Sequence, residues 1–352
     1  MEAIVDARVK IIERIYFINI CYTNIYIKFY LTVGVTESII IGIFMDAELQ
    51  NTTLFCTLQF QKPVRIDNYP AFVVRGVLGY HLKKMHCVVH GTPCQECVFY
   101  KTCAYVFLFE SIIDKDSPVL EGRDRASHPF RLVCHAEPNS VTKQIDLRVQ
   151  LYGRATEYVP HILFALREAG KTGLFRERAP YQLLVQNARG ETVLQGDRIQ
   201  ESVLVKDVIK FPAGNEVKTK QLLIHCNTPL RFKVHNQYNS DFSAKDFYFA
   251  AFRRIVTLFS LYGTIFANTF IDITEPEELL LHKGTLVWKD YTRYSGRQKT
   301  VMMLGGVQGS FTLEGSAPQA VWQTFTTAGT LGVGKNTSFG FGDITVEETH
   351  ND

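Results

Sequence analysis

The chain has 352 residues, a length that suits two domains because one hydrophobic core commonly serves about 100–200 residues. Its residues are 46% hydrophobic and 21% charged, which excludes a disordered, collagen-like or coiled-coil protein. Lysine and arginine number 38 against 35 acidic residues, so the net charge is only +3 and a site for a polyanion must come from local clustering.

Residues 1–44 differ in composition from the rest of the chain. They are rich in isoleucine, but Arg14, Lys28 and Glu37 interrupt the apolar stretches. A signal peptide needs an unbroken apolar run, and a membrane span needs about 20 nearly uncharged residues. We therefore predict an irregular extension over 1–44 and no membrane attachment.

The pattern over residues 45–214 predicts a first domain in which strands and helices alternate. A β-rich segment ends before Pro63, a helix follows Pro70, and Gly170 closes a second helix. The segments that carry this pattern are strands over 54–60, 145–152 and 181–186 and a helix over 160–169.

A polar stretch over 212–218 marks a boundary, and residues 215–352 repeat the same order of elements. Strands are predicted over 222–226, 230–234, 286–293, 310–313 and 344–347, with helices over 244–262 and 318–325. Each half fits the order β-α-β-β-α-β, which predicts an α+β protein with tandem ferredoxin-like (RRM-like) domains.

A cysteine-rich insertion follows the first helix of the first domain. Four thiols lie close together in the sequence, at Cys87, Cys94, Cys97 and Cys103. Four thiolates match a closed tetrahedral zinc site, which predicts a structural metal and no metal for catalysis. An iron–sulfur cluster also uses four cysteines, and unligated thiols are the plainer alternative. Such crowding without a secretory signal indicates a cytoplasmic protein.

A glycine-rich segment over 329–343 lies near the C-terminus. Its glycines suit either a tight hairpin or a loop that presents N–H groups to phosphate oxygens, with Lys335 adding a charge. It is not a nucleotide-triphosphate loop, because Asn336 follows Gly334-Lys335 where that pattern needs Ser or Thr.

Residues 332–342, Gly-Val-Gly-Lys-Asn-Thr-Ser-Phe-Gly-Phe-Gly, resemble the signature loop of the CRISPR-associated RAMP proteins. The likeness is closest to the endoribonucleases that process precursor CRISPR RNA. Three further segments, over 74–76, 151–155 and 293–298, appear in the family's order. The resemblance implies two ferredoxin-like domains and metal-independent cleavage of repeat RNA. In that reaction a 2′-hydroxyl attacks the adjacent phosphate and leaves a 2′,3′-cyclic phosphate and a 5′-hydroxyl.

The first helix of the first domain holds the candidate catalytic residues, because the family places a catalytic histidine on or beside it. We predict His81 as acid or base, Lys84 as charge stabiliser and Tyr80 as an orienting hydroxyl, since three- and four-residue steps can share a helical face. His86 and His90 are alternatives for the histidine.

Candidate RNA contacts lie on the second domain, at Arg293, Arg297, Gly332, Gly334 and Lys335. Aromatic and cationic residues alternate near the first two, which suits base stacking and phosphate contact. The predicted partner is precursor CRISPR RNA. An alternative function is a non-catalytic RAMP subunit that binds guide RNA beside other subunits of a CRISPR effector complex.

Overall fold

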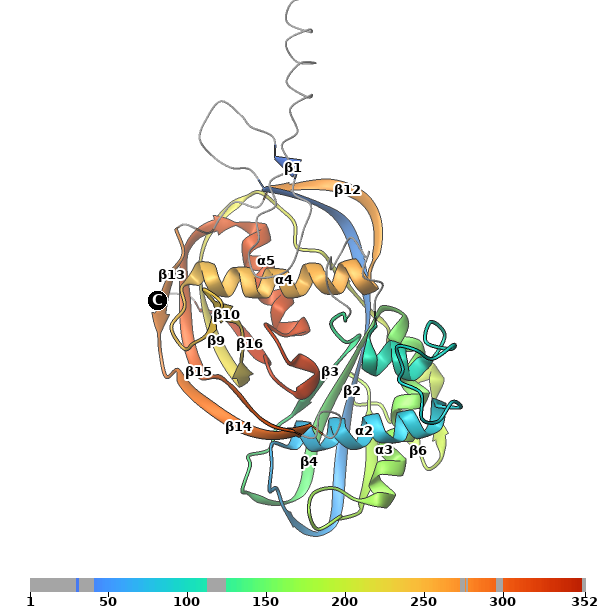
Figure 1. Cartoon of the computed structure of the whole chain (residues 1–352). Coiled ribbons are helices and arrows are strands. Elements are labelled where there is room, and N and C mark those ends of the chain that lie inside the picture. Colours follow the sequence, from blue (N-terminus) through green and yellow to red (C-terminus); the bar gives the residue numbers. More distant parts are fainter. Residues whose placement is uncertain are drawn as a thin grey trace, which may run out of the picture.

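The computed structural model describes residues 30–31, 41–112, 125–272, 276, 278–295 and 300–349. Within this part, a seven-stranded and a five-stranded antiparallel sheet are each covered on one face by helices (Figure 1). None of the helices described is both long and apolar enough to span a membrane. The predicted extension over 1–44 lies mostly outside these residues, and its last four residues begin strand β2 (Ile41–Arg65).

The first domain has the predicted element order. Its sheet runs β5-β2-β4-β3 with antiparallel neighbours, the strand order 4-1-3-2 of a ferredoxin-like fold. The elements after β2 are α2 (Pro70–His86), β3 (Phe130–Cys134), β4 (Val141–Tyr152), α3 (Val159–Thr172) and β5 (Tyr181–Gln186).

The second domain repeats this arrangement. Strand β16 pairs with β9, β9 with β15, and β15 with β14, again the order 4-1-3-2. The elements are β9 (Val217–Leu230), α4 (Ala244–Tyr262), β13 (Leu280–Lys283), β14 (Val287–Ser295), β15 (Thr300–Pro318), α5 (Gln319–Leu331) and β16 (Ile344–Thr349). The predicted tandem ferredoxin-like fold is confirmed.

The two domains also contain smaller strands and helices outside the ferredoxin-like arrangement. Strands β1 (Tyr30–Leu31), β8 (Asp207–Lys210) and β12 (Thr264–Asp272) pair with β2, so the chain returns to the first sheet after α4. Two hairpins consist of β6 (Leu194–Gln195) with β7 (Arg198–Ile199) and β10 (Lys233–Val234) with β11 (Gln237–Tyr238). A π-helix spans Val106–Glu110, and 3-10 helices span Gly153–Tyr158, Glu201–Val203 and Thr337–Phe339.

Several predicted boundaries were wrong, among them the following three. Strand β2 continues through Pro63, because a bulge between the pairings of Gln59 and Val64 accommodates a residue that has no N–H to donate. Helix α3 continues past Gly170 and ends at Thr172, where the cap residue Gly173 has a φ of 81° that suits glycine. The strand predicted over 222–226 and part of that predicted over 230–234 form one longer strand, β9.

Local sequence explains where the main helices begin. Helix α2 starts at Pro70, whose fixed φ and missing N–H suit the first turn. Helix α4 begins with a capping box, in which Ser243 Oγ accepts from the Asp246 N–H and the Asp246 carboxylate accepts from the Ser243 N–H.

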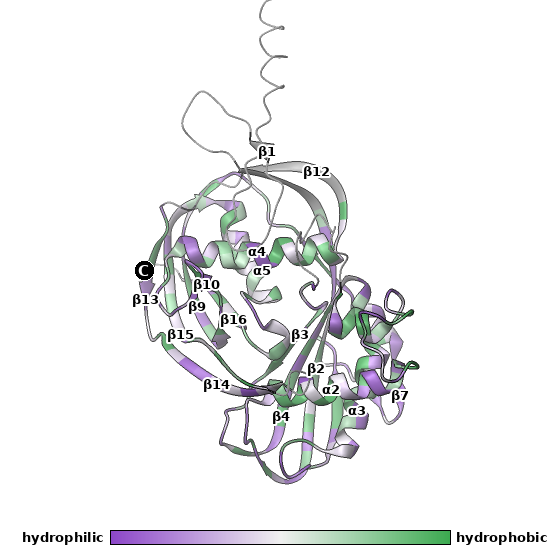
Figure 2. Cartoon of the chain, viewed as in Figure 1, coloured by the Kyte–Doolittle hydropathy of each residue, from purple (hydrophilic) through white to green (hydrophobic). Residues whose placement is uncertain are grey.

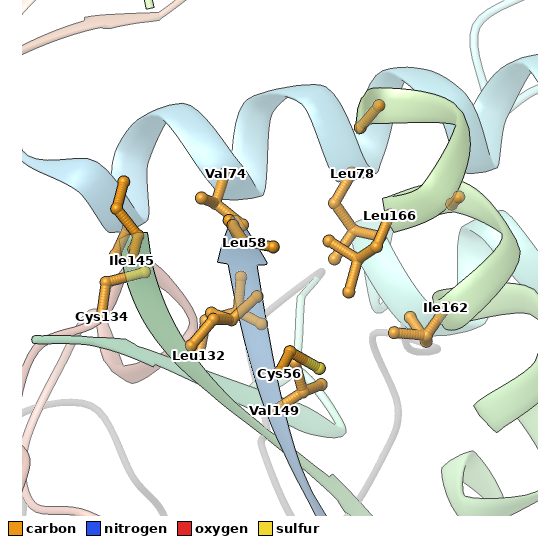
Figure 3. Close-up of a cluster of buried hydrophobic side chains, with 14 of the residues drawn as sticks. Cys56, Leu58, Val74, Leu78, Leu132, Cys134, Ile145, Val149, Ile162 and Leu166 are labelled. Carbon is orange, nitrogen blue, oxygen red and sulfur yellow. The ribbon is translucent and has the colours of Figure 1, made fainter. Parts of the chain in front are cut away.

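Each domain has its own core. Hydrophobic and hydrophilic residues alternate in bands along the longer strands and helices (Figure 2), as elements with one apolar face require. In the first domain, side chains from α2 and α3 meet those of the sheet (Figure 3), among them Leu58, Val74, Leu78, Leu132, Val149 and Leu166. The buried stripe of α2 leaves its other face for the second domain.

Candidate nucleic-acid interface

A cavity of about 1240 Å³ lies where α2 meets β14, β15 and the glycine-rich loop, residues 332–342. Figure 1 shows the ends of β14 and β15 reaching the start of α2. Helix α2 and the segment after it line one side with Arg75, Tyr80, Lys83, Lys84 and His90. The second domain contributes Arg293, Tyr294, Met302 and Phe339, and Glu110, Arg125 and His128 complete the wall.

The lining is strongly positive although the whole chain is nearly neutral. Among the residues that the structure describes, five cationic side chains line the cavity and one carboxylate, that of Glu110, does so. This carboxylate is already paired with Arg125 and accepts a hydrogen bond of 3.4 Å from the Tyr105 hydroxyl. The cavity therefore attracts a polyanion of the kind that a nucleic-acid backbone supplies.

Two arginines from different domains stack on the ring of Phe339 in the glycine-rich loop. The guanidinium carbons of Arg75 and Arg293 lie 4.0 and 4.2 Å from the ring centroid. Burial, and then the charge of Arg293, lower the pKa of Arg75 to about 9, and burial lowers that of Arg293. No carboxylate among the described residues pairs with Arg293. A bound phosphate would offset this like-charge repulsion.

His128 has a structural position in the wall. Its Nε2 lies 2.9 Å from both the Arg75 guanidinium and the Phe109 carbonyl oxygen. Depending on the tautomer, Nε2 either accepts a hydrogen bond from Arg75 or donates one to Phe109. Burial, followed by the positive charge of Arg75, lowers the pKa of His128 to about 3. The imidazole is therefore neutral at pH 7 and holds Arg75 in place.

The three residues predicted to share a catalytic face of α2 point in two directions. Tyr80 and Lys84, four residues apart, both line the cavity, and Tyr80 is 62% exposed. His81 is 9% exposed and its Nε2 lies 3.2 Å from the Thr172 hydroxyl of α3. It shares the buried stripe with Leu78, three residues earlier, and is not part of the cavity lining.

The two alternative histidines, His86 and His90, also lie in different places. The ring of His86 lies 4.9 Å from that of His161 on α3, and burial, then the charge of His161, lower the pKa of His86. His90 is exposed at the rim of the cavity, in the segment between α2 and the cysteine-rich stretch. Among the histidines proposed from the sequence, only His90 lies where a substrate in the cavity would contact it.

The glycine-rich loop packs closely against both domains. Gly334 has a φ of 76°, and a Cβ there would lie 2.3 Å from the carbonyl oxygen of Arg231. Gly332 has a φ of 79°, and its N–H donates to the Ala328 carbonyl, so this hydrogen bond caps the C-terminal end of α5. These two glycines allow the close approach that brings Phe339 into the cavity wall.

The remaining predicted RNA contacts lie at different places. Arg293 lines the cavity, whereas Lys335 is exposed on the loop and outside the cavity lining. Arg297 lies outside the residues that the structure describes.

The four predicted zinc ligands follow α2 as a cysteine-rich insertion. All four are free thiols, and the charges of Cys103 and Cys87 are among the smaller causes that raise the pKa of Cys94, after burial and Glu110. Within the described residues, no three His, Cys, Asp or Glu side chains are grouped so that they could hold a metal ion. A structural metal at these four thiols therefore stays a prediction.

A buried ion cluster, missed from the sequence, ties the domains together behind the cavity. The carboxylate of Asp343, at the end of the glycine-rich loop, pairs with Arg131 on β3 and Arg148 on β4. Arg131 is fully buried and also donates to the Thr330 carbonyl oxygen at 2.9 Å. The Asn227 side chain donates to the same carboxylate at 3.2 Å. An acidic residue ending a glycine-rich loop was the available sequence signal.

The fold and the cavity thus define a two-domain α+β protein with a site for a polyanion between its domains. The family model of the CRISPR-associated endoribonuclease Cas6 matches residues 224–344, and a model described as an N-terminal domain matches residues 49–206. A search of curated proteins found no match.

Several solved structures are similar. A Cas6 product complex is 15% identical, with a TM-score of 0.49 over 84% of this chain and 100% of that chain. A Thermus thermophilus Cas6 is 13% identical, with a TM-score of 0.45 over 85% and 99% of the two chains. A partial Cas6-RT-Cas1–Cas2 complex is 11% identical, with a TM-score of 0.48 over 87% and 47%. The match of residues 224–344 to the Cas6 endoribonuclease model agrees with the class predicted from the sequence, that of the CRISPR-associated RNA-processing proteins.

Proposed function

We propose that this protein is a metal-independent endoribonuclease that cuts CRISPR repeat RNA into guide RNAs. The observation that carries the proposal is the interdomain cavity, whose described lining has five cations, one carboxylate and an exposed histidine, His90. The match of residues 224–344 to the Cas6 endoribonuclease model supports the same substrate class.

The RNA provides its own nucleophile in this reaction. The 2′-oxygen attacks the adjacent phosphorus while the bond to the 5′-oxygen breaks, which gives a 2′,3′-cyclic phosphate and a 5′-hydroxyl without water. The protein must hold the two oxygens in line, because alignment supplies much of the rate. Arg75 and Arg293, each held against Phe339, are placed to grip the scissile phosphate, and Lys84 neutralises the charge that develops on it.

Proton transfer completes the mechanism. A histidine takes the proton of the 2′-hydroxyl or gives one to the departing 5′-oxygen. We assign this role to His90, which the cavity exposes to substrate, with His81 retained as the alternative that the sequence favours. Tyr80 orients the reacting group through its hydroxyl, four residues from Lys84 on the same face of α2.

The remaining RNA contacts extend from this site. Arg297 continues the β14 side of the cavity in sequence, and Lys335 extends the positive charge along the glycine-rich loop. Gly332 and Gly334 act by letting the loop approach its neighbours.

The test is incubation of the protein with a CRISPR repeat RNA in EDTA, followed by analysis of the product ends. We expect cleavage to persist, the upstream product to carry a cyclic phosphate, and a 2′-deoxy residue at the cut to abolish the reaction. Loss of all cleavage in EDTA, or a 5′-phosphate product, would refute the proposed chemistry.

A non-catalytic guide-RNA-binding subunit of a CRISPR effector complex is the second candidate. It is favoured by one observation, the burial of His81 against α3. Tight binding of repeat RNA without cleavage would support it.

The cysteine-rich segment can hold a structural metal if its thiols draw together. Four thiolates would close the coordination shell of zinc and leave no position for water, so the metal would fix the segment that carries His90. Elemental analysis of purified protein decides this, and absence of both zinc and iron would remove the metal.

A further inference from the structure

A second group of cations surrounds the ring of Tyr238, which we name the Tyr238 cluster: Arg231, Lys233, Tyr238 and Lys335. The Arg231 guanidinium carbon lies 3.5 Å from the ring centroid, and the Nζ atoms of Lys233 and Lys335 lie 5.6 and 5.9 Å from it. None of the three cations pairs with a carboxylate among the described residues. Three like charges beside one ring attract an anion.

The cluster is held in place by the backbone around it. Lys233 and Tyr238 face each other across the β10–β11 hairpin, whose turn uses positive φ angles of 47° at His235 and 66° at Asn236. Arg231 donates to the Gly305 carbonyl of β15 at 2.5 Å, and its own carbonyl accepts from the Lys335 N–H at 2.7 Å. The charges are therefore positioned before any ligand binds.

The glycine-rich loop separates this cluster from the cavity. Phe339 lines the cavity, whereas Lys335, four residues earlier, lies beside Tyr238, and no member of the Tyr238 cluster lines the cavity. A strand that leaves the cavity over this loop meets a second set of positive charges.

We propose that the Tyr238 cluster binds a backbone phosphate of the RNA outside the cut position, through the ammonium groups of Lys233 and Lys335. Arg231 and the Tyr238 ring hold these groups in place. The inference rests on the proposed function, because it extends the path of the same RNA, and it adds a contact that fixes the register of the strand in the cavity.

The test measures binding of a repeat RNA made uncleavable by a 2′-deoxy residue at the cut, over a range of salt concentrations. The double variant Lys233→Glu/Lys335→Glu should bind at least about tenfold more weakly, and the slope of log K against log salt should fall by about 0.7, because one phosphate contact on a single strand is lost. Lys233→Arg/Lys335→Arg should bind like the wild type. Lys143→Glu, at an exposed lysine of β4, is the control for reversing one surface charge outside the cluster.

A short RNA confined to the cavity separates the two proposals. It should bind equally to the wild type and to the double Glu variant, whereas Arg293→Ala should weaken both RNAs. If the double Glu variant binds the full repeat like Lys143→Glu while Arg293→Ala weakens it, the Tyr238 cluster has no such role. If Arg293→Ala and the double Glu variant both leave binding unchanged, the proposed function itself fails.

Discussion

Two histidines that line the same cavity lie in opposite surroundings. His128 is enclosed between Arg75 and the Phe109 carbonyl, where protonation would place a second positive charge beside the arginine. His90 is exposed to solvent at the rim. The enclosed imidazole of His128 therefore fixes the geometry of Arg75, and the exposed imidazole of His90 is accessible from the cavity.

The pKa of His128 makes the stability of the protein depend on pH. The unfolded chain binds a proton at this histidine near pH 6.5, whereas the folded protein does so only near pH 3. The unfolded state thus binds more protons below pH 6.5, so the stabilisation is complete above pH 6.5 and is lost as the pH falls toward 3. We expect about 3 kcal/mol to be lost between pH 7 and pH 4 from this group.

Urea unfolding at pH 7, 5.5 and 4 measures this loss. His128→Gln keeps an amide N–H for the Phe109 carbonyl and does not titrate, so its stability should fall less steeply with acid than that of the wild type. His235→Asn, at an exposed turn position with positive φ that Asn tolerates, is the control. Equal slopes for His128→Gln and the wild type would contradict the assignment.

The role in proton transfer that we propose for His90 can be tested by substitution. His90→Ala should slow single-turnover cleavage at saturating RNA by about 100-fold or more, because general acid–base catalysis contributes 10²–10⁴-fold. His81→Ala removes a buried contact with Thr172 and should change the rate less than tenfold. If His81→Ala abolishes cleavage and His90→Ala does not, the role belongs to His81.

The histidine problem shows what residue patterns can and cannot predict. Steps of three and four residues place Tyr80 and Lys84 together on α2, and both line the cavity. The same rule allows His81 to join Lys84, yet position 81 is also three residues from buried Leu78. Whether His81 lies with Lys84 at the cavity or with Leu78 in the core depends on how α3 packs against α2. That packing is set by tertiary contacts, which the spacing of residues in the sequence does not reveal.

At the scale of elements, the glycine-rich loop connects the end of α5 to β16 while touching β9, the β10–β11 hairpin and α2. Its positive φ angles turn the chain so that Phe339 faces the cavity and Lys335 faces Tyr238. The loop therefore positions the side chains of Phe339 and Lys335, and the amide of Gly332 is already bonded within the protein.

Substitution within the loop should show this positioning role. Gly334→Ala adds a Cβ against the Arg231 carbonyl and strains a φ of 76°, so it should destabilise the protein by about 1–3 kcal/mol and weaken RNA binding. Gly329→Ala is the matched control within α5, where the new Cβ meets Val346 at an ordinary 3.5 Å. That helical substitution should be neutral or stabilise by up to about 1 kcal/mol, as measured by thermal melting.

Element prediction succeeded where periodic patterns are long. The helix 244–262 and the strand 181–186 have the predicted bounds, because apolar periodicity and caps agree there. Prediction failed at Pro63 and Gly170, where the sheet bulge and the continuing helix override local signals. The fold class and its order of elements were predictable, and the exact ends were not.

At the scale of the whole molecule, Asp343 fixes the two domains relative to each other. Its carboxylate lies between Arg131 and Arg148 of the first sheet, while its N–H bonds to the Thr228 hydroxyl of the second domain at 2.9 Å. Arg131 has no exposed surface, so opening this contact would expose charges that pair only across the interface. The width of the cavity is therefore set by the protein rather than by its ligand.

Removing the Asp343 carboxylate should destabilise the folded protein. Asp343→Asn leaves the buried Arg131 without its counter-charge, which should destabilise the protein by about 3–5 kcal/mol in urea unfolding. Glu347→Gln, an exposed acid on β16, should change stability by less than about 0.5 kcal/mol. A stable Asp343→Asn variant that still binds repeat RNA like the wild type would show that the cluster is not needed to hold the cavity together.

The return of β12 to the first sheet makes the two halves unsuited to separate expression. Residues 42–48 of β2 are covered by β12, which comes after the first helix of the second domain. A truncated chain that stops at residue 214 would leave that edge with unpaired N–H and C=O groups, a ready template for edge-to-edge aggregation. Either half is therefore best studied within the full-length polypeptide, and gene fusions that interrupt it should yield insoluble fragments.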